Sequence, residues 1–124
     1  MFGNTFTYVN GLAVTISPPQ PYTPTDTAYI SEPAPPAFVV FDVTIVNGTA
    51  TNYEPTLFSA TMQSANVESD PVFDSGGGIN GSPSTVLLPG RETVFRMAFG
   101  ATDPADLVLE VSPGFEYDPA VFTS

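Results

Sequence analysis

The chain of 124 residues contains no cysteine, histidine, lysine or tryptophan. Without cysteine there is no disulfide framework and no thiol nucleophile, and without histidine there is no ordinary catalytic triad and no histidine-ligated metal. The absence of lysine excludes a Schiff base, so serine and threonine hydroxyls would have only carboxylates as bases. We therefore predict that the protein is not an enzyme and uses no cofactor.

Positive charge is also scarce. Arg91 and Arg96 are the two basic residues against 13 aspartates and glutamates, which gives a formal net charge of −11. Nucleic acids and anionic lipid surfaces attract proteins through clustered positive charge, so neither is an expected partner. No stretch approaches the ~18 apolar residues of a membrane span, and no signal-like segment opens the chain. We expect membrane attachment only through a lipid anchor outside this chain.

Apolar residues recur at every second position along most of the chain, which is the spacing of strands with one buried face. The clearest segments are residues 12–16, 39–45, 95–99 and 107–111, and residues 58–62 and 85–88 are weaker candidates. Proline, glycine and β-branched residues interrupt every window of helical length, so helices longer than one turn are not expected. We predict a single all-β domain over residues 1–124 with about seven strands.

Turn signals separate these segments, namely Asn10-Gly11, Asn47-Gly48, Asn80-Gly81 and Pro89-Gly90. Asn-Gly suits the positive φ angles of tight hairpins, and Pro-Gly suits a type II turn. Seven of the 14 prolines lie in residues 18–36. Because proline removes ladder donors, we predict that this proline-rich passage crosses over the edge of the sandwich in an extended form.

Two segments of the chain are similar to each other, NYEPTLFSA (residues 52–60) and EYDPAVFTS (residues 116–124). Each combines an aromatic residue, an acid, a proline and an apolar-Phe pair, which predicts a proline-initiated helical turn pinned by the phenylalanine. We expect Phe58 and Phe122 to be anchored against the sandwich. The alternative is coincidence in a chain rich in proline and phenylalanine.

The order of the motifs is similar to that of a known family. Along the chain come NGLAVTISPP, the proline-rich passage, FVVFDVTIVNGT, YEPTLFSA, VFDSGGG, LLPGRETVFRMAFG and DLVLEVSP. This order, over roughly residues 10–112, resembles the immunoglobulin-like domains of unknown function in actinobacterial cell-envelope lipoproteins. Those domains are akin to a small secreted mycobacterial immunogenic protein with an Ig-like sandwich.

The resemblance implies an immunoglobulin-like antiparallel β-sandwich with no established catalytic residues. It also implies an extracytoplasmic location, secreted or lipid-anchored at the cell surface, because such domains usually follow a signal peptide, a lipidated cysteine and a linker. The function that follows is a non-catalytic interaction or structural module. Its protein or cell-envelope partner is not identified by the sequence.

Two tripeptides, Asn47-Gly48-Thr49 and Asn80-Gly81-Ser82, match the sugar-acceptor pattern of eukaryotic secreted proteins. In a bacterial protein neither would be used in this way, and Pro83 makes the second a poor acceptor. We predict instead that Asn47-Gly48 terminates a strand.

The stretch Phe73-Asp74-Ser75-Gly76 resembles the active-site loop of aspartic proteases. In a homodimer, two Asp74 carboxylates would share a proton, so that one activates water and the other protonates the leaving group. The stretch departs from the protease pattern because Gly77-Gly78 follows it and because it lies late in the chain. A dimeric aspartic-type protease acting through Asp74-Ser75-Gly76 is thus the less favoured alternative, and the favoured interpretation is a flexible glycine-rich loop with one solvated acid.

The acidic loop of residues 68–74 offers a further alternative, a calcium- or ligand-binding sandwich. Glu68, Asp70 and Asp74 could supply oxygen ligands, of which Ca²⁺ takes about six to eight. Their spacing does not match a regular calcium loop, and Pro71 interrupts it. A second acidic cluster, Asp103, Asp106 and Glu110, is interpreted as the solvated face of a strand.

Overall fold

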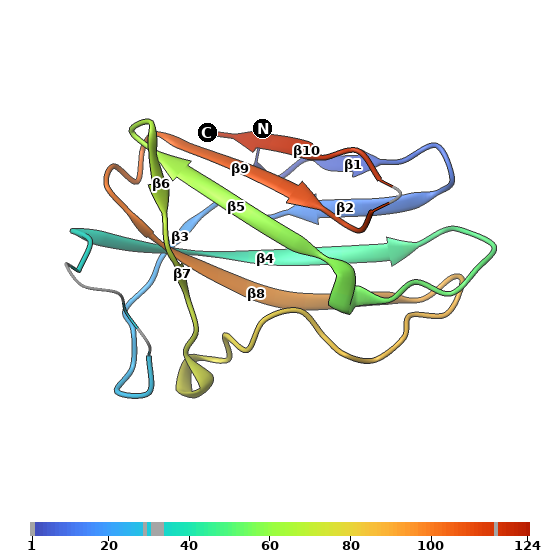
Figure 1. Cartoon of the computed structure of the whole chain (residues 1–124), viewed down its shortest axis with the longest axis horizontal. Helices are drawn as coiled ribbons and strands as arrows, with labels where there is room; N and C mark the ends of the chain where they lie inside the picture. The colour runs from blue at the N-terminus through green and yellow to red at the C-terminus, as the bar shows by residue number, and fades with distance from the viewer. Residues whose placement is uncertain (1, 29, 31–33, 116) are drawn as a thin grey trace.

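The computed structural model describes residues 2–28, 30, 34–115 and 117–124; Met1, residues 29 and 31–33 of the proline-rich passage, and Glu116 lie outside the described residues. Two antiparallel sheets pack face to face in an immunoglobulin-like β-sandwich (Figure 1). The prediction of an all-β sandwich is therefore confirmed. None of the described segments forms a helix with the length and apolar character to span a bilayer.

The larger sheet runs in the order β1-β2-β4-β8-β7, and β3 pairs with β4 beside β2. Its strands are β1 (Thr5–Thr7), β2 (Leu12–Ile16), β3 (Gln20–Pro21), β4 (Ala37–Asn47), β7 (Pro71–Val72) and β8 (Glu92–Ala101). The smaller sheet runs β10-β9-β5-β6, with β5 (Ser59–Ser64), β6 (Val67–Ser69), β9 (Leu107–Ser112) and β10 (Ala120–Thr123). The chain passes from one sheet to the other between β6 and β7, at Asp70.

The main core lies between the two sheets and follows the alternation of the sequence. In β4 the odd-numbered residues 39–45 are buried, and β9 contributes Leu107, Leu109 and Val111. Phe41 is fully buried between the rings of Phe2 and Phe99. Alternation along paired strands thus selects the inward faces, as the sequence pattern indicates.

A second, smaller core covers the outer face of the larger sheet. Val40 of β4 and Ala98 of β8 point outward, and Val72 and Ile79 bury them. Tyr22, Ala28 and Phe38 pack against this cluster. Within the described part of the proline-rich passage, Gln20–Pro21 pair with β4 as β3, and Tyr22 and Ala28 pack on the outer face of the larger sheet.

The described residues form ten strands rather than about seven. The strands absent from the sequence-based expectation are β1, β3, β6, β7 and β10, which have two to four residues each and so carry too little alternation to detect. Residues 85–88 do not form a strand; Leu87 makes a single bridge to Tyr53. Tertiary pairing, not local pattern, creates these short elements.

Helical structure in the described residues is confined to two short 3₁₀ turns, η1 (Pro55–Leu57) and η2 (Ser75–Gly77). The predicted turn at Pro55 is confirmed, with Phe58 N–H donating to the Pro55 carbonyl. The predicted turn after Asp118 is wrong, because residues from Ala120 onward pair with β9 as β10. Phe58 and Phe122 are both buried, so their anchoring role is confirmed.

Candidate functional site

Asp74 is the residue on which the protease, calcium and solvated-acid interpretations all depended, and its side chain is fully buried. One carboxylate oxygen accepts hydrogen bonds from Tyr22 Oη at 2.5 Å and from Thr25 N–H at 2.7 Å. The other accepts from Thr27 Oγ1 at 2.6 Å and from Thr25 Oγ1. Asp74 therefore ties the proline-rich passage to the glycine-rich loop that follows it.

The charge on Asp74 is maintained by these donors. Burial alone raises the pKa of the carboxyl, but the hydrogen bonds from Thr25, Thr27 and Tyr22 outweigh it and hold the pKa well below its usual range. For Tyr22, burial and then the hydrogen bond to Asp74 raise the pKa to about 12. At neutral pH the pair is a phenol donating to a carboxylate.

These contacts correct the interpretation of the 73–78 segment as a flexible loop with one solvated acid. The segment is held by an Asp74–Ile79 bridge, and Gly76 N–H donates to Thr27 Oγ1. Gly77 lies against Tyr22, because a Cβ at this position would come within 2.0 Å of the Tyr22 hydroxyl. The carboxylate faces its own chain, so this geometry also argues against two Asp74 side chains meeting across a protease dimer.

The calcium alternative is not supported by the geometry. Among the described residues, no three acidic side chains come together in a group suited to a metal ion. Glu68 and Asp70 are exposed on the β6–β7 segment, whereas Asp74 is buried and its oxygens are occupied. Asp103, Asp106 and Glu110 are exposed as predicted, but only Glu110 lies on a strand, β9, and the other two precede it.

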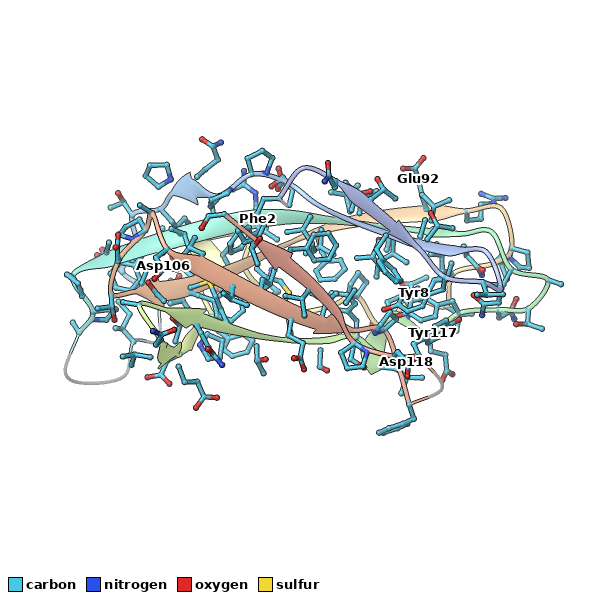
Figure 2. The ribbon with its side chains drawn as sticks, turned by 90° about the horizontal axis from the view of Figure 1, so that it is seen from above. Phe2, Tyr8, Glu92, Asp106, Tyr117 and Asp118 are labelled. Carbon is cyan, nitrogen blue, oxygen red and sulfur yellow. The ribbon has the colours of Figure 1, made fainter. Side chains whose placement is uncertain are left out.

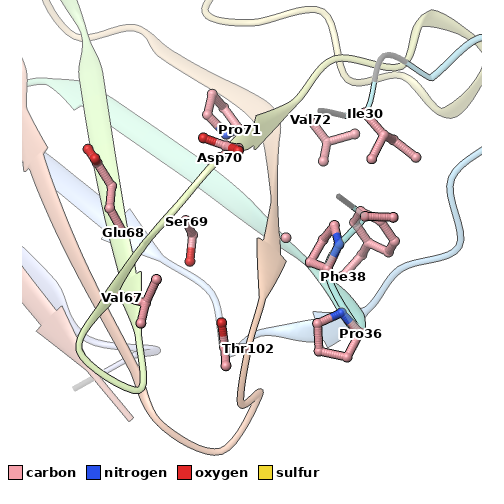
Figure 3. A pocket seen from close by; sticks show the side chains of 13 residues that line it. Ile30, Pro36, Phe38, Val67, Glu68, Ser69, Asp70, Pro71, Val72 and Thr102 are labelled. Carbon is pink, nitrogen blue, oxygen red and sulfur yellow. The ribbon is translucent and has the colours of Figure 1, made fainter. Parts of the chain in front are cut away.

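Glu68 and Asp70 instead line a pocket of about 380 Å³ beside the β6–β7 segment (Figure 3). In that view the β6–β7 segment lies on one side of the pocket, and Ile30, Pro36 and Phe38 lie on the other. The predicted acidic loop of residues 68–74 is instead strand β6, which holds Glu68, then Asp70 and strand β7. The apolar wall opposite these acids was not predicted, because it comes from residues about 30 positions earlier.

Asn47 ends β4, as predicted, and its side chain is fully buried. Its Nδ2 donates to the carbonyls of Thr51 and Leu87 at 2.9 and 2.8 Å, and its Oδ1 accepts from the N–H and hydroxyl of Thr49. The amide is thus fully used inside the protein and is not placed to carry a sugar. Asn47 joins the loop after β4 to the segment before β8.

Several loops meet at one end of the sandwich, which we call the tyrosine end (Figure 1). It consists of residues 8–11, 48–58, 86–91, 113–115 and 117–119. Tyr8 Oη donates to the Asp118 carbonyl and Tyr53 Oη to the Pro113 carbonyl, each at 2.7 Å. Burial raises the pKa of both phenols, so they remain donors at neutral pH.

Tyr117 lies at the centre of the tyrosine end. Its ring meets the Tyr8 and Tyr53 rings edge to face, with centroids 4.9 and 6.5 Å apart, and its hydroxyl accepts from Asn10 Nδ2 at 2.9 Å. Figure 2 shows Tyr8, Tyr117 and Asp118 grouped at this end, with Asp106 at the other. The Tyr8, Tyr53 and Tyr117 rings thus form one aromatic base shared by three segments of the chain.

Apolar side chains on this base face solvent. Val9 and Phe115 are fully exposed, and Leu57, Val86 and Leu88 are between 42 and 49 % exposed. Shallow hollows of about 470 and 260 Å³ lie here, and Tyr117 lines both. This surface was not predicted from the sequence. The signal that could have indicated it is that aromatic and apolar residues lie next to turn residues in several separate segments of the chain.

Two solved structures share the fold. A candidate lipoprotein from Bacillus subtilis matches with a TM-score of 0.70 at 9 % identity, over 100 % of this chain and 38 % of that chain. An uncharacterised β-sandwich protein from Clostridium difficile matches with a TM-score of 0.59 at 13 % identity, over 99 % of this chain and 91 % of that chain. This chain thus spans less than half the length of the Bacillus protein.

Identities this low show a shared fold alone. The two neighbours support the sandwich part of the family resemblance, and they give no support to an actinobacterial origin or to the mycobacterial protein. No protein-family model and no curated protein matches the sequence.

Proposed function

We propose that the chain is a non-catalytic, extracytoplasmic module of a secreted or lipid-anchored bacterial protein, and that it binds another protein through the tyrosine end. The observation that carries this proposal is the set of exposed apolar side chains around the aromatic base of Tyr8, Tyr53 and Tyr117. Contiguous exposed apolar surface is unusual on a soluble domain and is typical of interaction sites. Interfaces are also enriched in tyrosine and phenylalanine.

The partner is a protein surface that presents apolar side chains together with lysine or arginine. Glu54, Glu92 and Asp118 are exposed around the tyrosine end against one exposed basic residue there, Arg91, and the whole chain has a net charge of −11. Opposite charge at the rim of an interface speeds association and selects the partner. A second copy of this chain would bring 11 further negative charges to the contact, which disfavours self-association.

A non-catalytic role is supported by the environment of Asp74, the residue that most resembled a catalytic one in the sequence. Asp74 is buried and hydrogen-bonded within its own chain, and the sequence offers no histidine, cysteine or lysine to replace it. The extracytoplasmic location draws on the family resemblance, with its actinobacterial lipoproteins, and on the lipoprotein description of the Bacillus neighbour. Treatment of intact producing cells with proteinase K tests the location: an exposed domain is digested while a cytoplasmic marker survives.

A display library of random 12-residue peptides tests the binding surface. We expect the selected peptides to be enriched in aromatic, leucine and basic residues. The double variant Val9→Ser, Phe115→Ser should lose at least about tenfold in affinity for them. The matched control is Val94→Ser, Val121→Ser, which removes two exposed apolar side chains from strands β8 and β10. Absence of enrichment, or an equal loss in both double variants, would overturn the proposal.

A further inference from the structure

We propose that an extended peptide segment bearing lysine or arginine binds along β6 as an added strand, with an apolar side chain in the pocket beside it. This site is separate from the tyrosine end. The β5–β6 turn is adjacent to Asp106 through a hydrogen bond from Ala65 N–H to the Asp106 carbonyl, and Asp106 lies at the opposite end of the molecule (Figure 2). The proposal therefore goes beyond the proposed function.

The β6–β7 segment is placed to receive a strand. β6 is the outermost strand of the smaller sheet, and β7 is the outermost strand of the larger one. An outermost strand presents backbone donors and acceptors on its outer edge, and an extended chain can pair with them. Pro71 in β7 has no N–H, so we assign the added strand to Val67–Ser69.

The pocket gives this edge a side-chain specificity. Its volume of about 380 Å³ lies between the β6–β7 segment and an apolar wall that contains Ile30, Pro36 and Phe38 (Figure 3). Val72, which belongs to the small outer core, also lines the pocket. In strand addition the backbone supplies affinity, and a pocket that receives alternate side chains supplies selectivity. A valine, leucine or phenylalanine side chain suits this lining.

The acidic side chains beside the pocket favour basic residues at the remaining positions of the peptide. Glu68 and Asp70 line the pocket and are exposed, and both basic residues of the chain lie in or next to β8 rather than in the pocket lining. Side chains of an added strand alternate between faces, so a peptide that alternates apolar and basic residues satisfies the pocket and the carboxylates together. An acidic peptide would meet both the local carboxylates and the net charge of −11.

The test uses the intact protein and three synthetic hexapeptides, with binding followed by backbone amide NMR shifts. The probe is acetyl-Lys-Val-Lys-Val-Lys-Val-amide; its controls replace lysine by glutamate, or methylate alternate backbone nitrogens of the lysine peptide. We expect saturable shifts confined to the β6–β7 segment and the pocket lining with the lysine peptide. The glutamate and N-methylated peptides should bind at least about tenfold more weakly, because one lacks complementary charge and the other lacks ladder donors.

A charge-reversed variant locates the site on the protein. Glu68→Lys, Asp70→Lys should weaken binding at least about tenfold, whereas Glu92→Lys, Glu110→Lys, which changes the net charge equally at exposed residues outside the pocket lining, should reduce it less than about threefold. The Val9→Ser, Phe115→Ser variant should leave this binding unchanged, which separates failure here from failure of the proposed function. Shifts spread over the whole surface, equal affinity for the N-methylated peptide, or equal loss in the two charge-reversed variants would overturn the proposal.

Discussion

Asp74 shows how one buried carboxylate can hold a segment that has little secondary structure of its own. Residues 22–28 contain no strand in the structure, yet their hydroxyl and amide donors converge on Asp74. A buried charge is tolerated only when it is fully hydrogen-bonded, and here all of the donors come from one short segment. The result is a defined covering for the outer face of β4 and β8.

We predict that Asp74→Asn lowers the melting temperature by several degrees at neutral pH, because the amide NH₂ group would face donors. The same variant tests the pH dependence. The folded-state pKa of Asp74 lies below its unfolded value, so the stabilisation is fully present above the unfolded pKa of about 3.9 and is lost as the pH falls toward the folded value. Urea midpoints measured from pH 7 to pH 3 should show a constant gap between parent and variant down to about pH 5, and a narrowing gap below it.

The control for this prediction is Asp26→Asn, which neutralises an exposed carboxylate in the same segment. That variant should change the free energy of unfolding, obtained from the urea midpoint, by less than about 0.5 kcal/mol. If Asp74→Asn were as stable as the parent at pH 7, the hydrogen-bond network would not be holding the segment, and the earlier interpretation of a solvated acid would return.

Asn47 yields a second prediction at the same scale. Asn47→Asp would turn a carboxylate oxygen toward the carbonyls of Thr51 and Leu87, which each lose the Asn47 donor and keep one other, Thr49 Oγ1 and Tyr53 N–H respectively. We expect a loss of at least about 2 kcal/mol in the free energy of unfolding, since a buried carboxylate oxygen without a donor would face two carbonyl oxygens, and a charged group left unpaired costs more than the about 1–3 kcal/mol of a neutral one. Chemical denaturation measures it. Asn80→Asp is the matched control, because Asn80 also precedes glycine but is exposed, and an equal loss there would contradict the assignment.

Among the elements, β4 and β8 form the longest pairing, from Ala37–Ala101 to Val46–Glu92. Odd-numbered residues of both strands face the smaller sheet. The depth of burial differs along β8, however: Phe99 is buried, whereas Phe95 and Met97 are only partly buried. Phe95 lies toward the end of the sandwich where Phe58 meets it edge to face, with centroids 5.4 Å apart.

This difference in burial predicts that replacing a phenylalanine by alanine costs more stability at Phe41 than at Phe95. Phe41→Ala should cost about 3–5 kcal/mol, the usual range for a fully buried phenylalanine. Phe95→Ala should cost less, because part of its ring already contacts water and the site can relax toward solvent. Denaturation of the two variants under one condition gives the comparison. A Phe95→Ala variant as damaging as Phe41→Ala would mean that the aromatic contact with Phe58 carries more stability than burial indicates.

Several turns could be predicted from the local sequence alone. The Leu88–Arg91 turn forms with Gly90 at φ +80°, as Pro-Gly predicts, and Asn10-Gly11 closes the β1–β2 hairpin. Gly11 and Gly48 also pack backbone against backbone, since a Cβ on Gly11 would lie 2.4 Å from the Gly48 carbonyl oxygen. The β5–β6 turn was missed, because Ala65 and Asn66 adopt positive φ without the expected glycine.

At the scale of the whole molecule, the C-terminal strand completes the smaller sheet. β10 pairs with β9, Phe122 is buried in the main core, and Ser124 N–H donates to the Leu107 carbonyl. Phe2 N–H donates to the Thr123 carbonyl, so the two ends of the chain are tied together. Figure 1 shows them side by side.

We predict that a chain truncated after Pro119 loses its cooperative thermal transition, because removal of β10 uncovers the β9 edge and empties the Phe122 position. Differential scanning calorimetry of the truncated and full chains measures this. The control is Val121→Ser, which keeps the β10 backbone and changes an exposed side chain. A truncated chain with the parent's transition would show that the last strand is a dispensable tail.

The amino-acid sequence by itself determined the fold class, the inward faces of the long strands, the strand end at Asn47 and the single helical turn at Pro55. These features depend on alternation over five or more residues, or on local turn chemistry, which neighbouring residues specify without help from the rest of the chain. The same is true of the classes of chemistry that missing histidine, cysteine and lysine exclude.

Only the tertiary structure decided the environment of Asp74, the pocket beside Glu68 and Asp70, and the tyrosine end. Each is built from segments far apart in the chain: Asp74 is held by residues 22–27, the pocket joins Ile30 and residues 34–38 to residues 67–72, and Tyr8 contacts Tyr117. Burial and hydrogen bonding of a side chain depend on which distant segment covers it. No local pattern carries that information. For this reason Asp74, an acid in a glycine-rich stretch, was predicted to be solvated although it is buried.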